Sequence, residues 1–262
     1  MHDTNRLSLM KIATWNVNSL NVRLPHLLDW LTTAKPDVVG LQEIKCEDTK
    51  FPLEAIHEAG YQAVFAGQKT YNGVALLSRE PAADVQRGIP GYEDPQQRII
   101  AATFGDVRVV NGYFPNGQAP GSEKFTYKLD WLSHLTAWLR DEINAHPALC
   151  LIGDYNIAPT DADAHPDWKE AIHVSPPERA AFAALESLGL TDVFRQFEQA
   201  EKSFSWWDYR MNAFRRNFGL RIDHILASGI LADRCTECVI DKSPRMLERP
   251  SDHTPVIATF KG

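Results

Sequence analysis

The sequence has few cysteines, no long apolar run and no excess of positive charge, and each absence narrows what the protein can be. Its four cysteines, in a chain of 262 residues, are too few and too scattered for a disulfide framework. No run reaches the ~18 to 20 apolar residues of a membrane span, and Met1 to Leu9 lacks the apolar stretch of a secretory signal. We therefore expect a cytoplasmic protein with reduced thiols and no membrane contact.

The formal net charge is -7 at pH 7, which weighs against a nucleic-acid partner. Lys and Arg residues that neutralise phosphates supply most sequence-independent affinity for nucleic acids. Net charge averages over the whole surface, however, whereas a cleft responds to its local field, and a cation site needs clustered carboxylates. The charge weakens a DNA-binding interpretation without excluding it.

Neither a repeat nor a linker divides the chain, so we predict one compact domain. Apolar periodicity predicts helices over 24–31 and 129–143, and Ser175, Pro176 and Glu178 form a capping box that begins a third. Helices among strands that must pair as hairpins indicate an α/β sandwich. The predicted strands are 11–17, 37–41, 74–78, 99–104, 107–114, 149–153, 222–228, 235–241 and 254–260.

Polar side chains gather at the ends of these predicted strands. Side chains just past strand ends face a crevice at the sheet edge, and antiparallel strands bring residues at strand starts to that same edge. Any one of them alone is more simply a turn former. Together they predict a site, in which Glu43 offers the hard oxygen that Mg²⁺ prefers. The group consists of Asn16, Gln42, Glu43, Tyr113, Asp154, Asn156, Asp223, Asp252 and His253.

Asp223 and His253 suggest an oriented imidazole. A carboxylate that accepts from one ring nitrogen fixes the tautomer and raises the imidazole pKa, which leaves the other nitrogen to donate to a phosphate oxygen. A histidine satisfied within the core is the alternative. Acyl transfer is not expected, because no G-x-S-x-G motif occurs. Cys235 and Cys238 form a C-x-x-C, but in a strand we expect the two thiols to face opposite ways, without a zinc or redox site.

The stretch 204–221 interleaves aromatic and basic residues, a mixture that suits a nucleic acid. Rings stack on bases or deoxyribose, and guanidinium groups pair with phosphates. Phe204 and Phe218 are equally well explained as core residues. We expect contact from Arg210, Arg215 and Arg216, because three arginines so close together are hard to bury.

Eight segments match a known pattern in its order along nearly the whole chain: 15–20, 41–45, 71–75, 113–117, 153–159, 204–210, 220–226 and 249–253. The chain thereby resembles the exonuclease III family of the endonuclease/exonuclease/phosphatase (DNase I-like) superfamily. The resemblance implies a four-layer αββα sandwich and Mg²⁺ or Mn²⁺ as cofactor. It also implies a base-excision-repair enzyme on double-stranded DNA, a 3′–5′ exodeoxyribonuclease and/or abasic-site (AP) endonuclease with 3′-end cleaning. Residues 1–9 precede the usual start of the family, so we expect a flexible extension there and a single catalytic domain over 10–262. Little in the sequence suggests an oligomer, and we expect a monomer.

The resemblance also implies a role for each site residue. Glu43 would be the principal metal ligand, with Asn16 and Asp252 near the metal. Asp154 would orient or deprotonate the attacking water, and Asn156 would hold that water and the transition state. Tyr113 and His253 would donate to the phosphate, with Asp223 orienting His253. Contacts to DNA would come from Lys69, Tyr71, Asn72, Asn116, Arg210, Arg215, Arg216 and Trp206, the last against the sugar at the scission site.

One position departs from the pattern, since relatives with strong abasic-site activity usually carry Gly or Ser where His173 stands. We expect this imidazole to narrow the space for an extrahelical abasic deoxyribose, or to stack on a 3′-terminal sugar, and so to favour exonuclease activity. A surface turn residue is the alternative. Two other functions stay open: a phosphodiesterase of the same superfamily that acts on a non-nucleic-acid phosphoester, and a DNA-binding scaffold without chemistry.

Overall fold

Twelve strands form two six-stranded sheets within residues 9–262, the part of the chain that this computed structural model describes. The first sheet has the order β11-β12-β1-β2-β4-β3 and the second β5-β6-β7-β8-β10-β9. The strands are β1 (Leu9–Asn16), β2 (Val38–Gln42), β3 (Gln62–Ala66), β4 (Val74–Ser78), β5 (Ala83–Arg87), β6 (Ile99–Phe104), β7 (Val107–Tyr113), β8 (Leu149–Asp154), β9 (Leu190–Asp192), β10 (Asp223–Ser228), β11 (Cys235–Ile240) and β12 (Val256–Lys261).

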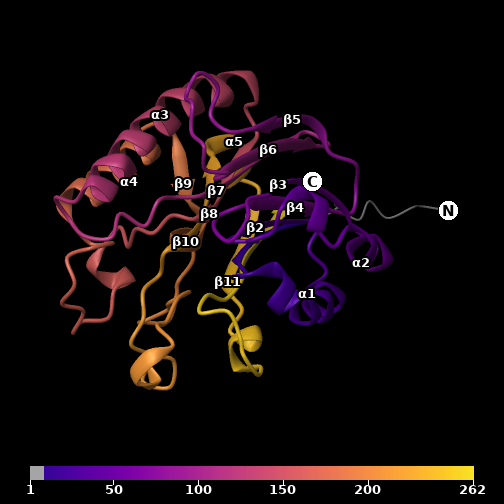
Figure 1. Ribbon diagram of the computed structural model, residues 1–262. Coiled ribbons are helices and arrows are strands. Elements are labelled where there is room, and N and C mark those ends of the chain that lie inside the picture. Colours follow the sequence, from indigo (N-terminus) through magenta and orange to yellow (C-terminus); the bar gives the residue numbers. More distant parts are fainter. Residues whose placement is uncertain (1–8) are drawn as a thin grey trace.

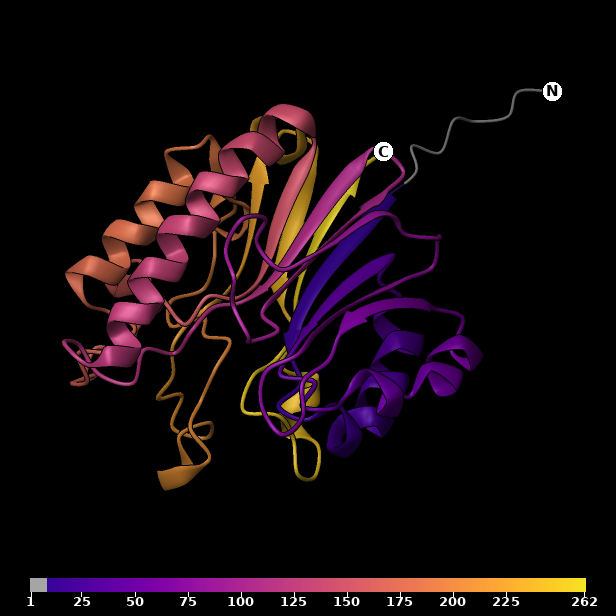
Figure 2. The ribbon, with the colours of Figure 1, turned by 45° about the horizontal axis from the view of Figure 1, so that its top comes forward.

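Helices cover the outer face of each sheet and give the predicted four-layer αββα sandwich (Figures 1 and 2). Helices α1 (Leu20–Ala34) and α2 (Leu53–Glu58) pack on the first sheet, and α3 (Glu123–Ala145) and α4 (Pro176–Glu186) pack on the second. The capping box predicted for α4 is present at Ser175. A short helix, α5 (Gly229–Ala232), precedes β11, and the 3-10 turns are η1 (Asp48–Lys50), η2 (Asp161–Asp163), η3 (Val193–Gln196), η4 (Arg210–Asn212) and η5 (Ser243–Met246).

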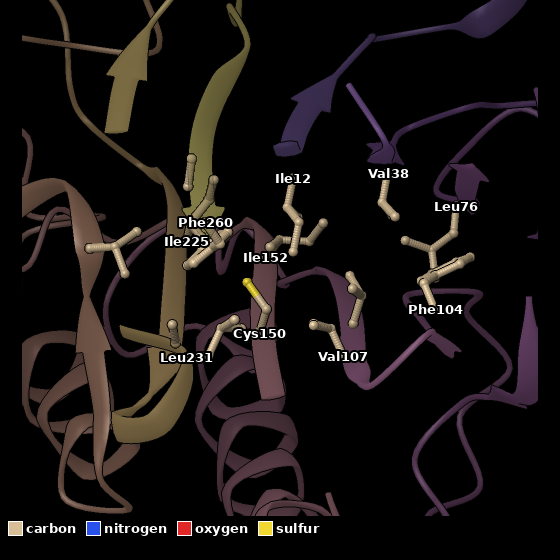
Figure 3. Close-up of a cluster of buried hydrophobic side chains, with 14 of the residues drawn as sticks. Ile12, Val38, Leu76, Phe104, Val107, Cys150, Ile152, Ile225, Leu231 and Phe260 are labelled. Carbon is tan, nitrogen blue, oxygen red and sulfur yellow. The ribbon is translucent and has the colours of Figure 1, made fainter. Parts of the chain in front are cut away.

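The main core lies between the two sheets, as Figure 3 shows. Ile12, Val38 and Leu76 of the first sheet face Val107 and Ile152 of the second. The central strands β2, β4 and β8 are buried along their whole length. Strands buried on both faces are apolar throughout, which is why these three were recognisable as continuous apolar runs.

Two parallel strand pairs bring the predicted site residues to one edge of the sandwich. β1 pairs with β2, and β7 pairs with β8, both in parallel, so each pair ends at the same edge. Asn16 lies at this edge, at the end of β1. Tyr113 at the end of β7 and Asp154 at the end of β8 also lie there, directly opposite each other. β10 runs antiparallel to β8 and places Asp223 opposite Asp154. The predicted convergence of strand ends is confirmed.

Gly153 lets β7 and β8 approach closely beside this edge. Its φ of +152° is one that residues with a side chain rarely adopt, and a Cβ atom there would lie 1.9 Å from the Gly112 carbonyl oxygen. Any substitution would therefore push the two strands apart. Because Asp154 follows directly, Gly153 helps to fix the separation between Tyr113 and Asp154.

The structure departs from the sequence-based prediction in several elements. Strands β3, β5 and β9 and helix α2 were not predicted, because β3 and β5 are only partly buried, β9 has three residues and α2 has six. Leu9, assigned to the extension, belongs to β1 and pairs with Lys261. The rest of the predicted extension lies outside the described residues. Across residues 9–262, the helices are too short or too polar to cross a bilayer.

The prediction that Cys235 and Cys238 face opposite ways is wrong. A bulge shifts the register of β11 between Cys235 and Glu237, so the two thiols are two register positions apart on β12 and lie on one face. Both contact the core between the sheets, where Cys150 also lies. All four cysteines are free, and Cys46 lies in the core beneath α1.

Arg221, part of the aromatic and basic stretch, is a buried structural residue with a relative exposure of 1%. Its Nε lies 2.7 Å from Asp163 Oδ1 and its Nη2 lies 2.7 Å from Asp192 Oδ2. Arg195 also pairs with Asp163. This network ties η2 and β9 to the start of β10, which carries Asp223.

We expect Arg221→Met to lower the free energy of unfolding by about 3–5 kcal/mol at pH 7, because Asp192 stays buried without its cationic partner and Asp163 keeps only Arg195. Urea unfolding followed by tryptophan fluorescence measures the change. As a control, Arg234→Met removes a surface pair with Asp106 and should lower the same free energy by less than ~1 kcal/mol. Equal losses of unfolding free energy in the two variants would contradict the role of Arg221 as a buried structural residue.

The loss should also depend on pH. Burial alone would raise the pKa of Asp163, but Arg221 outweighs burial and holds this pKa below its usual range. A carboxyl group with a depressed folded-state pKa stabilises above its unfolded pKa and loses that contribution as pH falls through the folded value. The difference between wild type and Arg221→Met should therefore be largest at neutral pH and shrink below about pH 4.

Candidate active site

Glu43, Asp154 and His253 form the centre of a polar cluster at the edge where the strands end. One ligand atom from each lies within 4.8 Å of the others. Glu43 directly follows β2, Asp154 ends β8, and His253 precedes β12. The centre therefore joins residues of both sheets, and any movement of one sheet against the other would change it.

Asn16 bridges the two sheets within this centre. Its side-chain Nδ2 donates to Glu43 Oε1 and to Asp154 Oδ2, both at 2.9 Å. Its Oδ1 accepts from the backbone N–H of Asn18. In this orientation Asn16 holds the two carboxylates in place and turns no oxygen toward the centre. Its predicted role as a metal ligand stays a prediction.

Asp223 holds His253, as predicted from the sequence. The imidazole Nδ1 lies 2.9 Å from Asp223 Oδ2, and the Ser205 hydroxyl donates to that same oxygen at 2.6 Å. Nε2, on the far side of the ring, lies 3.6 Å from Asp154 Oδ2. Burial lowers the pKa of His253, but Asp223 and then Asp154 outweigh burial and raise it. The ring is therefore an imidazolium whose Nε2–H points into the centre.

Asp154 and Asn156 form a tight turn at the end of β8. The Asn156 backbone N–H donates to Asp154 Oδ1 at 2.9 Å, and the Asn156 side-chain Nδ2 donates to the Phe114 carbonyl at 3.0 Å. Burial raises the pKa of Asp154, His253 lowers it, and Asp223 raises it again. The net rise makes Asp154 a better proton acceptor than an exposed carboxylate.

Tyr113 supplies a neutral donor beside the carboxylates. Burial raises its pKa well above the usual value, and Glu43 and Asp154 raise it further. Arg98 lies over the ring, 4.8 Å from its centroid. The phenol therefore keeps its proton at neutral pH, as donation to a phosphate oxygen requires.

Asp252 is held beside the centre by two donors. Asn18 Nδ2 donates to its Oδ1 and Trp206 Nε1 to its Oδ2, both at 2.9 Å. Lys45 contacts Asn18 and also pairs with Glu43 at 2.8 Å. Asp252 is not among the three central groups, so its place near a metal stays a prediction. It does fix the orientation of the Trp206 ring.

Some of the predicted DNA-binding residues share one groove next to the centre. Tyr71, Asn72 and Asn116 line a cavity of about 530 Å³, together with Arg98 and Lys124. Tyr71 is 67% exposed and is free to contact a ligand. Lys69 is exposed and does not line this cavity.

The predicted arginines lie on the loop that carries η4, apart from this groove. Arg210 and Arg216 line a second cavity of about 330 Å³ with Trp168 and Phe218, and Arg215 is exposed. Arg210 forms a bidentate pair with Asp208, in which Nε donates to Oδ1 and Nη2 donates to Oδ2. This loop and the loop before β12 project from the same edge of the sandwich (Figures 1 and 2).

His173 is buried, so the alternative of a surface turn residue is wrong. Its Nδ1 lies 2.7 Å from the Asn156 carbonyl oxygen. Burial and then Lys128 lower the pKa of His173, so the ring is neutral and Nδ1 donates to this carbonyl. The backbone φ of +71° explains why a glycine suits this position.

Several residues of the site were not predicted. Asn18, Lys45, Arg98 and Ser205 contact the predicted residues, and Lys128 contacts Asn156. Lys128 could have been recognised from the sequence, because it falls on the buried face of α3 among large apolar side chains. A lysine at such a position needs a buried partner. The contacts of the other four depend on loop geometry that the sequence does not reveal.

The donor set fits a hard divalent cation. Glu43 and Asp154 converge on one point, and carboxylate oxygens are the ligands that Mg²⁺ and Mn²⁺ take. The protonated His253 suits a phosphate better than a metal. A cation would also offset the repulsion that Asp154 meets from Glu43 and Asp223.

Comparisons with known proteins agree with this geometry. The endonuclease/exonuclease/phosphatase family model matches residues 13–253. Exodeoxyribonuclease III of Haemophilus influenzae is 41% identical, across 96% of this chain and 100% of that protein.

Solved structures extend the likeness to three dimensions. The 3′–5′ exonuclease NExo from Neisseria meningitidis is 50% identical, with a TM-score of 0.94 over 97% of this chain and 100% of that one. A further structure describes NExo from Neisseria as a 3′ phosphatase bound to a product DNA hairpin, at 49% identity, a TM-score of 0.94 and the same coverage. An AP endonuclease from Archaeoglobus fulgidus is 39% identical, with a TM-score of 0.92 over 96% of this chain and 99% of that one.

In the metal-free protein, we expect the His253 imidazole to stay protonated at pH 7, and Asp223→Asn to lower its pKa by about 1 to 3 pH units. A raised pKa means that the proton leaves only as pH rises well above neutrality. NMR titration of the ring protons measures this, and His253→Gln assigns the signal. Asp208→Asn, which removes a carboxylate away from the ring, is the control. A wild-type signal that titrates near the ordinary value of 6.5 would contradict the imidazolium.

Proposed function

The chain belongs to the endonuclease/exonuclease/phosphatase family, and on this basis we propose that it is a divalent-metal-dependent DNA phosphodiesterase of the exonuclease III kind. Its substrates are double-stranded DNA with 3′ ends, from which it removes nucleotides or blocking phosphates, and DNA with abasic sites. Such activities belong to base excision repair. The predictions of a monomer and of a cytoplasmic location go with this proposal.

One observation carries the proposal: two carboxylates, Glu43 and Asp154, face an imidazole that Asp223 keeps charged. Hydrolysis of a phosphodiester needs a group that takes a proton from water and donors for the charge that develops on the phosphate oxygens. The site places a proton acceptor and hydrogen-bond donors within a few ångströms of each other. A scaffold without chemistry would have no reason to bury Asp154 and Asp223 together beside Glu43.

Asp154 orients the attacking water and accepts its proton. Its raised pKa favours proton transfer near neutrality, where an ordinary aspartate is a weak base. The Asn156 N–H holds Oδ1 of Asp154, so the other oxygen, Oδ2, faces the centre. Because water is the nucleophile, no covalent enzyme intermediate forms.

His253 and Tyr113 donate to the non-bridging phosphate oxygens. The imidazolium Nε2–H comes from the loop before β12 and the neutral phenol from the end of β7, in opposite sheets, and both are held before substrate arrives. Donors fixed in advance act on the transition state without reorganisation. Asp223 and Ser205 act through His253, by fixing its tautomer and orientation.

Glu43 would hold the divalent ion, Mg²⁺ or Mn²⁺, beside Asp154, with Asn16 and Asp252 around it. When bound, such an ion supplies Lewis-acid stabilisation of charge on phosphate oxygens. Lys45 already contacts Glu43, so the protein keeps part of this negative charge balanced.

The groove next to the centre fits a DNA strand better than a small phosphoester. Tyr71 offers an exposed ring, Asn116 an amide, and Arg98 and Lys124 positive charge, along a cavity that opens beside Asn156. Trp206, whose ring Asp252 fixes, lies 6.5 Å from the His253 ring and packs against the sugar at the scission site. Lys69, Arg210, Arg215 and Arg216 extend the contact.

His173 favours 3′ ends over abasic sites. Its buried ring occupies space next to Asn156, where a small residue would leave room for an extrahelical deoxyribose. NExo, which is half identical to this chain, is described as a 3′–5′ exonuclease and a 3′ phosphatase. We therefore rank 3′-end processing above abasic incision.

We expect Asp154→Asn to lower the rate of shortening of a labelled duplex with a recessed 3′ end by ~10² to 10⁴-fold, because it removes the proton acceptor. Glu43→Gln should raise the Mg²⁺ concentration needed for half-maximal rate by roughly 10-fold or more, because an amide is a poorer ligand than a carboxylate.

Removal of divalent ions with a chelator should abolish the activity of the wild type. Glu58→Gln, an exposed carboxylate on α2, is the matched control. Full activity in Asp154→Asn, or in excess chelator, would refute the proposal.

His173→Gly should raise cleavage of a duplex with an internal abasic-site analogue relative to shortening of a recessed 3′ end. The glycine adopts the left-handed backbone of this position without strain, so the variant should fold. Both substrates are measured with one enzyme preparation, so the ratio does not depend on the active fraction. An unchanged ratio would remove the gating role of His173, and cleavage of neither substrate by the wild type would favour a non-nucleic-acid phosphoester.

A further inference from the structure

Lys128 is fully buried, although it is a lysine in the second turn of a long helix, α3. Its Nζ donates to the Asn156 carbonyl at 2.8 Å, to the Asn116 carbonyl at 3.2 Å and to Glu178 Oε1 at 2.5 Å. An ammonium group has three protons, and here each has one acceptor. Two of the three acceptors belong to residues of the proposed site.

The position of Lys128 is built into the surrounding chain. A Cβ atom at Gly117 would lie 2.9 Å from the Lys128 Cδ, so this glycine leaves the room in which the lysine stem lies. Gly117 follows Asn116 directly and has a φ of +87°. The loop after β7 thus wraps around the lysine, and the Asn116 carbonyl turns toward it.

Asn156 depends on this contact, because its backbone is in the left-handed region, with a φ of +51°. A non-glycine residue adopts this conformation only where its surroundings enforce it. Its carbonyl oxygen accepts from both Lys128 Nζ and His173 Nδ1. On the other side its amide contacts Asp154, Phe114 and Asn116. Lys128 and His173, the two donors to this carbonyl oxygen, therefore set the direction in which the Asn156 side-chain amide points.

Glu178 carries the restraint to α4. Its Oε1 accepts from Lys128 and from the His173 N–H at 3.0 Å, and its Oε2 accepts from the Ser175 N–H and hydroxyl. One glutamate thus caps α4, pairs with α3 and holds the backbone of His173. The helix cap predicted from the sequence is also part of the support for the site.

We propose that Lys128 is a positioning residue, which acts through Asn156 and Asn116 to aim their amide groups at Asp154 and at the substrate. Glu178 extends this restraint to His173. A buried ion pair is weak evidence for stability, since apolar side chains of similar size often replace one without loss. Fixing the direction of Asn156 is a task that an apolar pair would not perform. This inference rests on the proposed phosphodiesterase function.

The test compares Lys128→Met with wild type on the recessed 3′ end, at saturating substrate and Mg²⁺ and at a temperature well below both unfolding midpoints. We expect kcat to fall by ~10 to 100-fold with a smaller change in KM, because a displacement of about an ångström at a reacting group has an effect of this size. Arg140→Met removes an exposed charge from the same helix and should leave kcat unchanged. Glu178→Gln keeps an acceptor for the cap and should lower kcat less, which preserves the test if Lys128→Met folds poorly.

A double-mutant cycle with Asn156→Ala separates positioning from a merely structural role. If Lys128 acts through Asn156, Lys128→Met should lower kcat little further once Asn156 has become alanine. Independent, multiplicative losses would overturn the proposal, and so would an unchanged kcat in both Lys128→Met and Glu178→Gln.

A readout without activity keeps this inference distinct from the proposed function. The side-chain amide NMR signals of Asn116 and Asn156 should shift in Lys128→Met and stay in place in Arg140→Met. If the wild type cleaves no DNA but these signals shift, the proposed function fails and the positioning holds. If the wild type cleaves DNA and the signals do not move, the positioning fails alone.

Discussion

The close burial of like charges is the constraint on which the site depends. Asp154 and Asp223 face each other across β8 and β10 with relative exposures of 1% and 0%, and Glu43 lies next to Asp154. Three carboxylates so placed repel one another and are stable only with compensating charge or hydrogen-bond donors. Part of this compensation comes from the charges of His253 and Lys45 and from the N–H groups of Asn16 and Asn156. A divalent cation would supply more.

The sandwich makes this arrangement rigid by joining the two sheets through polar contacts at one edge and apolar contacts behind it. Asn16 links Glu43 and Asp154 across the sheets, and behind it Gln42 donates to Asn111 at 2.7 Å. Gly40 faces Asn111 with no room for a side chain of its own. Displacing either sheet would break these contacts together, so the geometry of the centre is coupled to the packing of the whole core.

Much of the fold and of the central site could be predicted from the sequence. Strand ends marked Glu43 and Asp154, and the chemistry of a histidine beside an aspartate marked His253 with Asp223, because these signals are local or depend on sheet topology. Side-chain partners remote in sequence could not be predicted. Arg221 stands in the aromatic and basic stretch, but it is buried against Asp163 and Asp192, and neither partner could be inferred from the sequence. The bulge in β11 turned Cys235 toward the core, and no residue type signals a bulge there.

The pairing of Leu9 with Lys261 has a practical consequence for handling the protein. β1 and β12 lie side by side, so the first described residue and the end of the chain meet at one edge of the sandwich (Figure 2). The site lies at the other end of these same strands, roughly 20 Å away over the length of β1. A surface anchor, fluorophore or fusion partner attached at Gly262 would therefore stand behind the enzyme and leave the DNA-facing loops unobstructed.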